Sequence, residues 1–271
     1  TENKESSYDE QTDGFVLRLG YPLSENLRQR VSYTLHNTRI DNVPSTASRF
    51  VREQEGERLT SMVGQELTYD RRDSKLMPTE GYVLRIKTEV AGLGGDAQYL
   101  RARGGGAFYV PLSGPDWVFS VMGEAGAIAG FASDDDDSIA INDRFFIGGD
   151  TLRGFRSSGI GPRDLTTTAE DALGGKYFAR GSVELTMPLG LPEEIGVKGH
   201  IFTDAGSLWG NNVTPLTGET FVDDATIRLA SGVGLSWRSP LGPLRVDLAF
   251  PILKEDYDKT QQFRLSFGTR F

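Results

Sequence analysis

Apolar and polar residues alternate with a period of two along most of this chain, the pattern of β-strands with two different faces. In residues 82–90, for example, Leu84 and Ile86 share one side and Arg85 lies on the other. The alternation recurs often enough to predict about eleven strands. The predicted strands cover residues 15–21, 27–36, 59–70, 82–90, 98–110, 117–130, 176–187, 197–205, 227–237, 244–250 and 263–271.

The connections between these strands differ in length. A long polar loop is predicted over 37–58, and residues 131–174 show no sustained alternation. In the C-terminal part, short turns rich in Pro and Gly at 111–116, 188–194 and 239–243 alternate with longer polar loops. This asymmetry is expected of an outer-membrane barrel, which has short turns on the periplasmic side and longer loops outside.

Two arrangements fit the alternation. In a soluble β-sandwich or barrel, the apolar faces form the core and the charged faces meet water. In a membrane barrel, the apolar faces meet lipid and the charged faces line the lumen. Two features favour the membrane: Arg and Lys recur in register on the polar faces, and aromatic residues gather at strand ends, as an interface girdle predicts. These aromatic residues are Tyr21, Trp117, Trp237, Phe250 and Phe271.

Hydropathy agrees with strands rather than helices as the spanning elements. No run of about 18 apolar residues is present, so no transmembrane helix is supported. A barrel strand places only every second residue in lipid, so a low mean hydropathy does not argue against it. We therefore predict an all-β fold, an antiparallel transmembrane β-barrel.

Composition excludes several classes of function. The net charge of -9 argues against a nucleic-acid partner, and the absence of Cys excludes disulfides and thiolate metal sites. The four aspartates at 134–137 lack the spacing of a calcium-binding EF-hand. His200 and Asp204 share a strand face about 13 Å apart, too far for a catalytic dyad, and His36 has no evident partner. We expect no enzyme activity, no metal and no cofactor.

The irregular region 131–174 contains one conspicuous motif, Leu152, Arg153, Gly154 and Phe155. Two later predicted strands each direct one carboxylate, Glu184 and Asp204, away from their more apolar side. If the strands close into a barrel, the loop can fold inside it and place Arg153 between the two acids, where the guanidinium fork suits carboxylates. The alternative is an Arg153 that is exposed to solvent in the loop.

Four motifs in order resemble the BamA/TamA superfamily of outer-membrane barrels, most closely the C-terminal barrel part of the BamA family. Residues 152–155 resemble its sixth-loop [VL]RGF signature, and 202–209 resemble its F-x-D-x-G-x-x-W strand motif. Residues 239–245 (SPLGPLR) resemble its penultimate hairpin, and 263–271 resemble its terminal-strand signal. The resemblance implies that Arg153 contacts Glu184 and Asp204. It also implies a terminal signal and seam at Phe263, Leu265, Phe267, Gly268 and Phe271.

The family barrel has sixteen strands preceded by POTRA domains. We therefore expect residues 1–271 to be the C-terminal portion of such a barrel, with the upstream part absent, and 131–174 to be a long extracellular loop folded into the lumen. An odd count of eleven strands agrees with a fragment, because bacterial single-chain barrels have even counts. Alternatively, residues 1–13 supply a ragged twelfth strand.

The resemblance implies an assembly factor that folds and inserts β-barrel proteins into the outer membrane of a Gram-negative bacterium. Its implied partners are outer-membrane lipid, unfolded outer-membrane protein clients and the accessory lipoproteins of the assembly complex. A weakly paired terminal strand would serve as a template for a client strand, and Gly268 could kink it. The alternatives are a secretion or translocation pore of the same superfamily, of the TamA or two-partner type, and a passive porin.

Overall fold

Eleven strands of the computed structural model form one antiparallel sheet in which each strand pairs with its neighbours in chain order. The structure describes residues 9–114, 116–131, 139–239 and 242–267. The sheet strands are β1 (Asp9–Pro22), β2 (Leu27–Asp41), β3 (Gly56–Asp70), β4 (Gly81–Gly95), β5 (Tyr99–Pro111), β6 (Val118–Gly130), β9 (Tyr177–Pro188), β10 (Val197–Trp209), β12 (Arg228–Ser239), β13 (Gly242–Leu253) and β15 (Phe263–Phe267). The number of strands and their antiparallel order confirm the predicted fold class.

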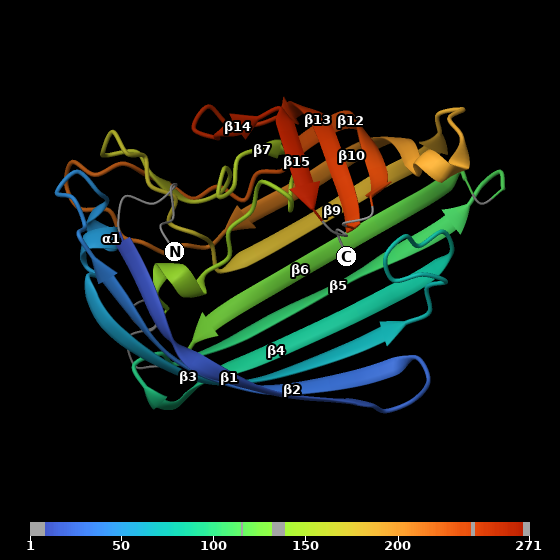
Figure 1. Cartoon of the computed structure of the whole chain (residues 1–271). Helices are drawn as coiled ribbons and strands as arrows, with labels where there is room; N and C mark the ends of the chain where they lie inside the picture. The colour runs from blue at the N-terminus through green and yellow to red at the C-terminus, as the bar shows by residue number, and fades with distance from the viewer. Residues whose placement is uncertain (1–8, 115, 132–138, 240–241, 268–271) are drawn as a thin grey trace.

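The sheet is strongly curved, so that its last strands lie across from its first ones (Figure 1). In the described part of the chain, β1 and β15 form its two edges. The remaining elements lie in the connections. They are α1 (Arg49–Arg52), η1 (Ile141–Asp143), β7 (Gly154–Phe155), β8 (Arg163–Asp164), η2 (Glu193–Ile195), β11 (Phe221–Val222) and β14 (Thr260–Gln261). Within this part of the chain, no helix is long and apolar enough to cross a membrane.

Several strands extend beyond their predicted ends. The predicted loop 37–58 is wrong at both ends, because β2 continues to Asp41 and β3 begins at Gly56. Residues 9–13 extend β1 and do not form a separate strand. Polar cross-strand contacts support these extensions where apolar alternation stops: Arg39 Nη2 lies 3.3 Å from Glu57 Oε1.

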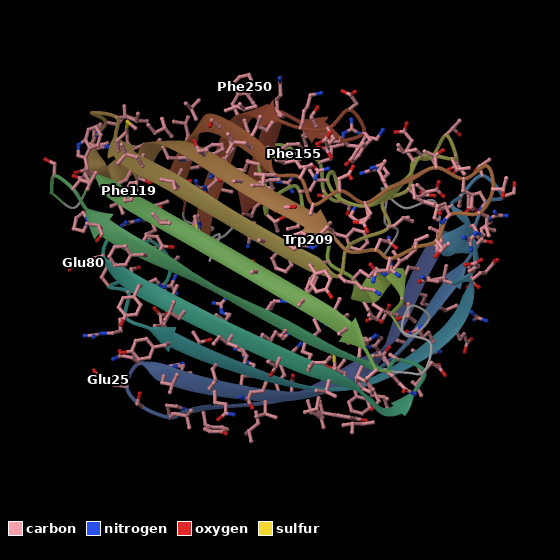
Figure 2. All side chains as sticks on the ribbon, turned by 180° about the vertical axis from the view of Figure 1, so that it is seen from behind. Glu25, Glu80, Phe119, Phe155, Trp209 and Phe250 are labelled. Atoms are coloured by element: carbon pink, nitrogen blue, oxygen red, sulfur yellow. The ribbon has the colours of Figure 1, made fainter. Side chains whose placement is uncertain are left out.

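The outer face of the sheet is apolar and exposed. Leu84 and Ile86 on β4 are 52% and 58% exposed, whereas their neighbour Val83 is fully buried on the concave inner face. Figure 2 shows Phe250 projecting from the outer side, while Phe155 lies beneath the strands on the inner side. The other aromatic residues predicted for the girdle, Tyr21, Trp117 and Trp237, are exposed, and Phe271 lies outside the described residues.

The hydrophobic core lies between the inner face and the loop that connects β6 to β9. Leu152, Phe155 and Ile160 of this loop pack in one buried cluster with strand residues such as Phe178 and Leu208. Burying each large side chain stabilises the fold by roughly 1.5–3 kcal/mol. The loop, drawn in yellow-green in Figure 1, therefore lies against the concave side of the sheet.

The connections at this end of the sheet also pair with one another. Strand β7 pairs with β14, and β8 pairs with β11, so three connections share backbone hydrogen bonds. A second apolar cluster joins Val51 of α1 to Ile141 and Leu173, with Phe221 packed against it. The loops therefore form a common layer over one end of the sheet.

A charge on the outer face tests whether that face meets lipid. We predict that Ile86→Lys destabilises the full-length protein in lipid vesicles by about 2–4 kcal/mol, the cost of a charge near the bilayer midplane. The matched control is Leu216→Lys, because Leu216 is 57% exposed but lies in the connection between β10 and β12. There we expect a change within about 0.5 kcal/mol. Denaturant unfolding measures both; an equally small effect at both positions would contradict a lipid-facing surface.

Candidate loop-anchoring site

Arg153 is 1% exposed and is held by three carboxylates. Its Nε and Nη2 donate to the two carboxylate oxygens of Asp204, each at 2.7 Å, in a bidentate pair. Its Nη1 lies 2.9 Å from Glu184 Oε2 and 3.2 Å from Asp247 Oδ1. The structure thus brings together the Arg and the two acids singled out in the sequence, and adds a third acid.

Two further side chains complete the surroundings of the guanidinium. Ser182 Oγ accepts from Arg153 Nη2 at 3.2 Å and donates to Asp204 at 2.5 Å. The guanidinium carbon lies 3.2 Å from the centre of the Phe202 ring, a cation–π contact in a buried setting. Phe202 begins the predicted strand motif 202–209, but the sequence indicated no role for its ring.

The strand register explains why these side chains meet. Ser182 on β9 is opposite Asp204 on β10, and Glu184 is opposite Phe202 two residues away. Two-residue steps keep side chains on one face, so all four point to the concave side. The loop between β6 and β9 places the Arg153 side chain among them.

The residues on either side of Arg153 fix its position. Leu152 and Phe155 are 0% and 1% exposed and pack into the core on both sides of it. Gly154 has a φ of +92°, which favours glycine, and a Cβ there would lie 2.9 Å from the Cβ of Ala230 on β12. Packing or charge therefore explains why each residue of the motif occupies its position.

Asp247 on β13 also binds a histidine. The Nε2 of His200 lies 2.6 Å from Asp247 Oδ1, and both side chains are buried. The contact spans β12, where Gly234 is opposite both residues and leaves the space open. The sequence predicted no pairing of His200 with Asp204, and it missed the partner Asp247 because a contact across three strands depends on their register.

A second arginine balances the acids. Arg245 Nη2 lies 2.8 Å from Glu184 Oε2. Burial disfavours the charged form of Arg153, but its bonds to Asp204 and the nearby charges of Glu184 and Asp247 outweigh burial and raise the pKa of Arg153 above its ordinary value. The guanidinium therefore stays cationic across the physiological pH range.

The terminal-strand residues lie apart from this cluster. Phe263, Leu265 and Phe267 on β15 are 59%, 52% and 78% exposed on the outer face. Gly268, Phe271 and the aspartates at 134–137 lie outside the described residues. In the part that the structure describes, no group of three His, Asp or Glu side chains is placed to hold a metal ion.

Comparison with known proteins gives a consistent result. The family model of the Omp85 superfamily domain matches residues 1–271. The outer membrane protein assembly factor BamA of Neorickettsia risticii is 33% identical over 259 residues, covering 96% of this chain and 33% of that protein. The human sorting and assembly machinery component 50 homolog is 33% identical over 177 residues, covering 62% of this chain and 35% of that protein. The chain therefore spans about a third of the length of these relatives.

A solved structure supports the fold. The crystal structure of BamA from Haemophilus ducreyi lacking POTRA domains 1–3 matches with a TM-score of 0.81 and 23% identity. The match covers 99% of this chain and 56% of that one. At 23% identity, this similarity shows a shared arrangement of strands and no more.

Removing Arg153 should be costly because it leaves buried carboxylates without their main cation. We predict that Arg153→Ala lowers the unfolding free energy of the full-length protein by about 3–5 kcal/mol. Asp204→Ala should cost a similar amount, and the double variant should cost less than the sum of the two. Arg39→Ala is the matched control, since its ion pairs with Asp41 and Glu57 are exposed and worth about 1 kcal/mol or less. Additive losses would contradict a coupled cluster.

The close packing around Gly234 should leave no room for a larger residue. A Cβ there would lie 2.3 Å from His200 Nε2 and 2.6 Å from the Val246 carbonyl oxygen. We predict that Gly234→Ala costs about 1–3 kcal/mol by overpacking and lowers the thermal unfolding temperature. Gly104→Ala, whose Cβ would meet nothing closer than 3.8 Å, should be near neutral. Equal thermal stability of the two variants would refute the crowding argument.

Proposed function

The chain belongs to the Omp85 superfamily, and from that premise we propose that it is the barrel part of an outer-membrane protein assembly factor that helps fold and insert other β-barrel proteins. The observation that carries this proposal is the buried ion cluster around Arg153. It fixes a loop against the inner face of the sheet, while the sheet still ends in an edge strand. We propose that this filled interior is combined with a terminal strand that can accept another strand.

We assign the loop 131–174 to the extracellular side of the barrel, folded into its lumen. Arg153 is its anchor, Glu184 and Asp204 are the inward carboxylates that bind it, and Leu152, Gly154 and Phe155 set its position. The buried cluster that joins Leu152 and Phe155 to the strands supports this assignment. An interior filled in this way does not suit a passive porin, which requires an open channel.

The edge strand supports the insertion step. Strand β15 pairs with β13 on one side, and in the described part no strand pairs with its other side. An unpaired edge presents backbone donors and acceptors that can template an incoming strand. We propose that the client strand adds at this edge and that Phe263, Leu265 and Phe267 keep its outer face in lipid.

The proposed function implies a location and a set of partners. We propose that the protein lies in the outer membrane of a Gram-negative bacterium and acts on unfolded outer-membrane protein clients together with accessory lipoproteins. Strand exchange needs neither bond cleavage nor a nucleotide, so no enzymatic step enters the mechanism. Outer-membrane lipid contacts the apolar face described above.

One observation favours a second candidate, a secretion or translocation pore of the same superfamily. A cavity of about 990 Å³ remains between the loops and the first strands, lined by polar side chains such as Arg58, Thr60 and Arg101. A polypeptide in transit would need such a polar route. The cavity lies on the side of the sheet away from β15, so the two candidates use different parts of the molecule.

Reconstitution distinguishes these functions. We predict that the full-length protein in vesicles accelerates insertion of an unfolded outer-membrane protein and that Arg153→Ala reduces the rate at least ten-fold, while Arg39→Ala does not. Deleting 131–174 should abolish insertion and open an ion conductance. Normal conductance before the deletion would indicate a porin, and transport of a client across the vesicle without its insertion would indicate a secretion pore.

A further inference from the structure

Among the described residues of the eleven-stranded sheet, the terminal strand β15 shares the fewest residue pairs with its neighbours. β15 shares five residue pairs with β13, whereas β12 and β13 share eleven. Its outer side chains, Phe263, Leu265 and Phe267, are each more than half exposed. To its backbone pairing with β13, the inner side chains of β15, Arg264 and Ser266, add polar contacts with another part of the chain.

Both inner side chains bind the same carboxylate. Arg264 Nε and Ser266 Oγ each donate to Asp150 Oδ1 at 2.6 Å. Asp150 belongs to the loop between β6 and β9, more than a hundred residues earlier in the chain. One loop side chain thus spans two successive inner positions of the edge strand.

Asp150 is itself held in place by the arginine motif that follows it. Arg153 is three residues further on and is fixed in the carboxylate cluster. Between them, Thr151 Oγ1 donates to the Gly148 carbonyl oxygen at 2.8 Å and accepts from the Gly148 amide at 2.9 Å. A Cβ at Gly149 would lie 2.7 Å from Arg264 Nη2, so the loop backbone also approaches the edge strand closely.

The backbone joins the same two segments. The Arg156 amide donates to the Lys259 carbonyl oxygen at 2.8 Å, and the Lys259 amide donates to the Gly159 carbonyl oxygen at 2.9 Å. Strand β14, which precedes β15 directly, pairs with β7 of the arginine motif. The loop and the terminal hairpin are therefore connected at several points.

Arg264 binds Asp150 although another acid lies opposite it in the sheet. Arg264 is directly opposite Asp247 in the β13–β15 pairing. Asp247 already binds Arg153 and His200. The Arg264 guanidinium instead engages Asp150 and Gln261.

We propose that Asp150 is a positioning residue for the terminal strand: it fixes β15 to the loop anchored by Arg153 and sets the register in which the strand edge is offered. This inference rests on the proposed function in one respect, that the β15 edge is where a client strand adds. Its structural part, the coupling of loop and edge strand, stands independently.

Hydrogen–deuterium exchange of the full-length protein in lipid tests the coupling. In Asp150→Ala we expect the β15 amides to exchange at least ten-fold faster, and residues 151–155 to exchange faster as Arg264 turns toward Asp247. Adding Arg264→Ala should return 151–155 to the original rate but leave β15 fast. The matched control is Asp256→Ala, which removes an exposed carboxylate from the connection between β13 and β15.

Client insertion measured on the same samples separates the two proposals. We expect Asp150→Ala to slow insertion several-fold and Asp256→Ala to leave it unchanged. Unaltered β15 exchange in Asp150→Ala, or an equal change in Asp256→Ala, overturns the positioning role even if the unaltered protein inserts clients. Faster β15 exchange in a protein that inserts no client supports the coupling and overturns the proposed function instead.

Discussion

One buried guanidinium holds together parts of this chain that lie far apart in sequence. Arg153 binds acids 31, 51 and 94 residues away, on three different strands. A charge removed from water is tolerated only when it is paired and hydrogen-bonded. Because each donor of Arg153 that faces the cluster meets an oxygen, the loop has one favourable position and the inner face of the sheet has one favourable occupant.

This constraint explains the unusual location of the core. The outer face of the sheet is apolar and exposed, so the strands cannot bury it against one another. Packing arises instead on the concave side, where Leu152 and Phe155 fill the space beside Phe178 and Leu208. The polar cluster and the apolar cluster share the same loop, so both hold that loop against the inner face of the sheet.

Local sequence patterns predicted much of this arrangement. The contacts that were not predicted depend on the register of strands far apart in the sequence. The eleven strands follow from alternation, which each segment shows by itself. Asp247 and His200 escaped because their contact depends on the register of three strands and on a small residue, Gly234, between them. The polar strand ends, such as Asp9 in β1, escaped because backbone pairing continues where the alternation has stopped.

The terminal strand shows how inner polar contacts can specify what lipid cannot. A slip of β15 by two residues would return its apolar side chains to the same lipid environment, so the outer face alone fixes no register. In the register of this structure, Arg264 and Ser266 both meet Asp150. A strand edge can therefore remain accessible on one side and still be defined in position, because the loop that specifies it is held elsewhere by Arg153.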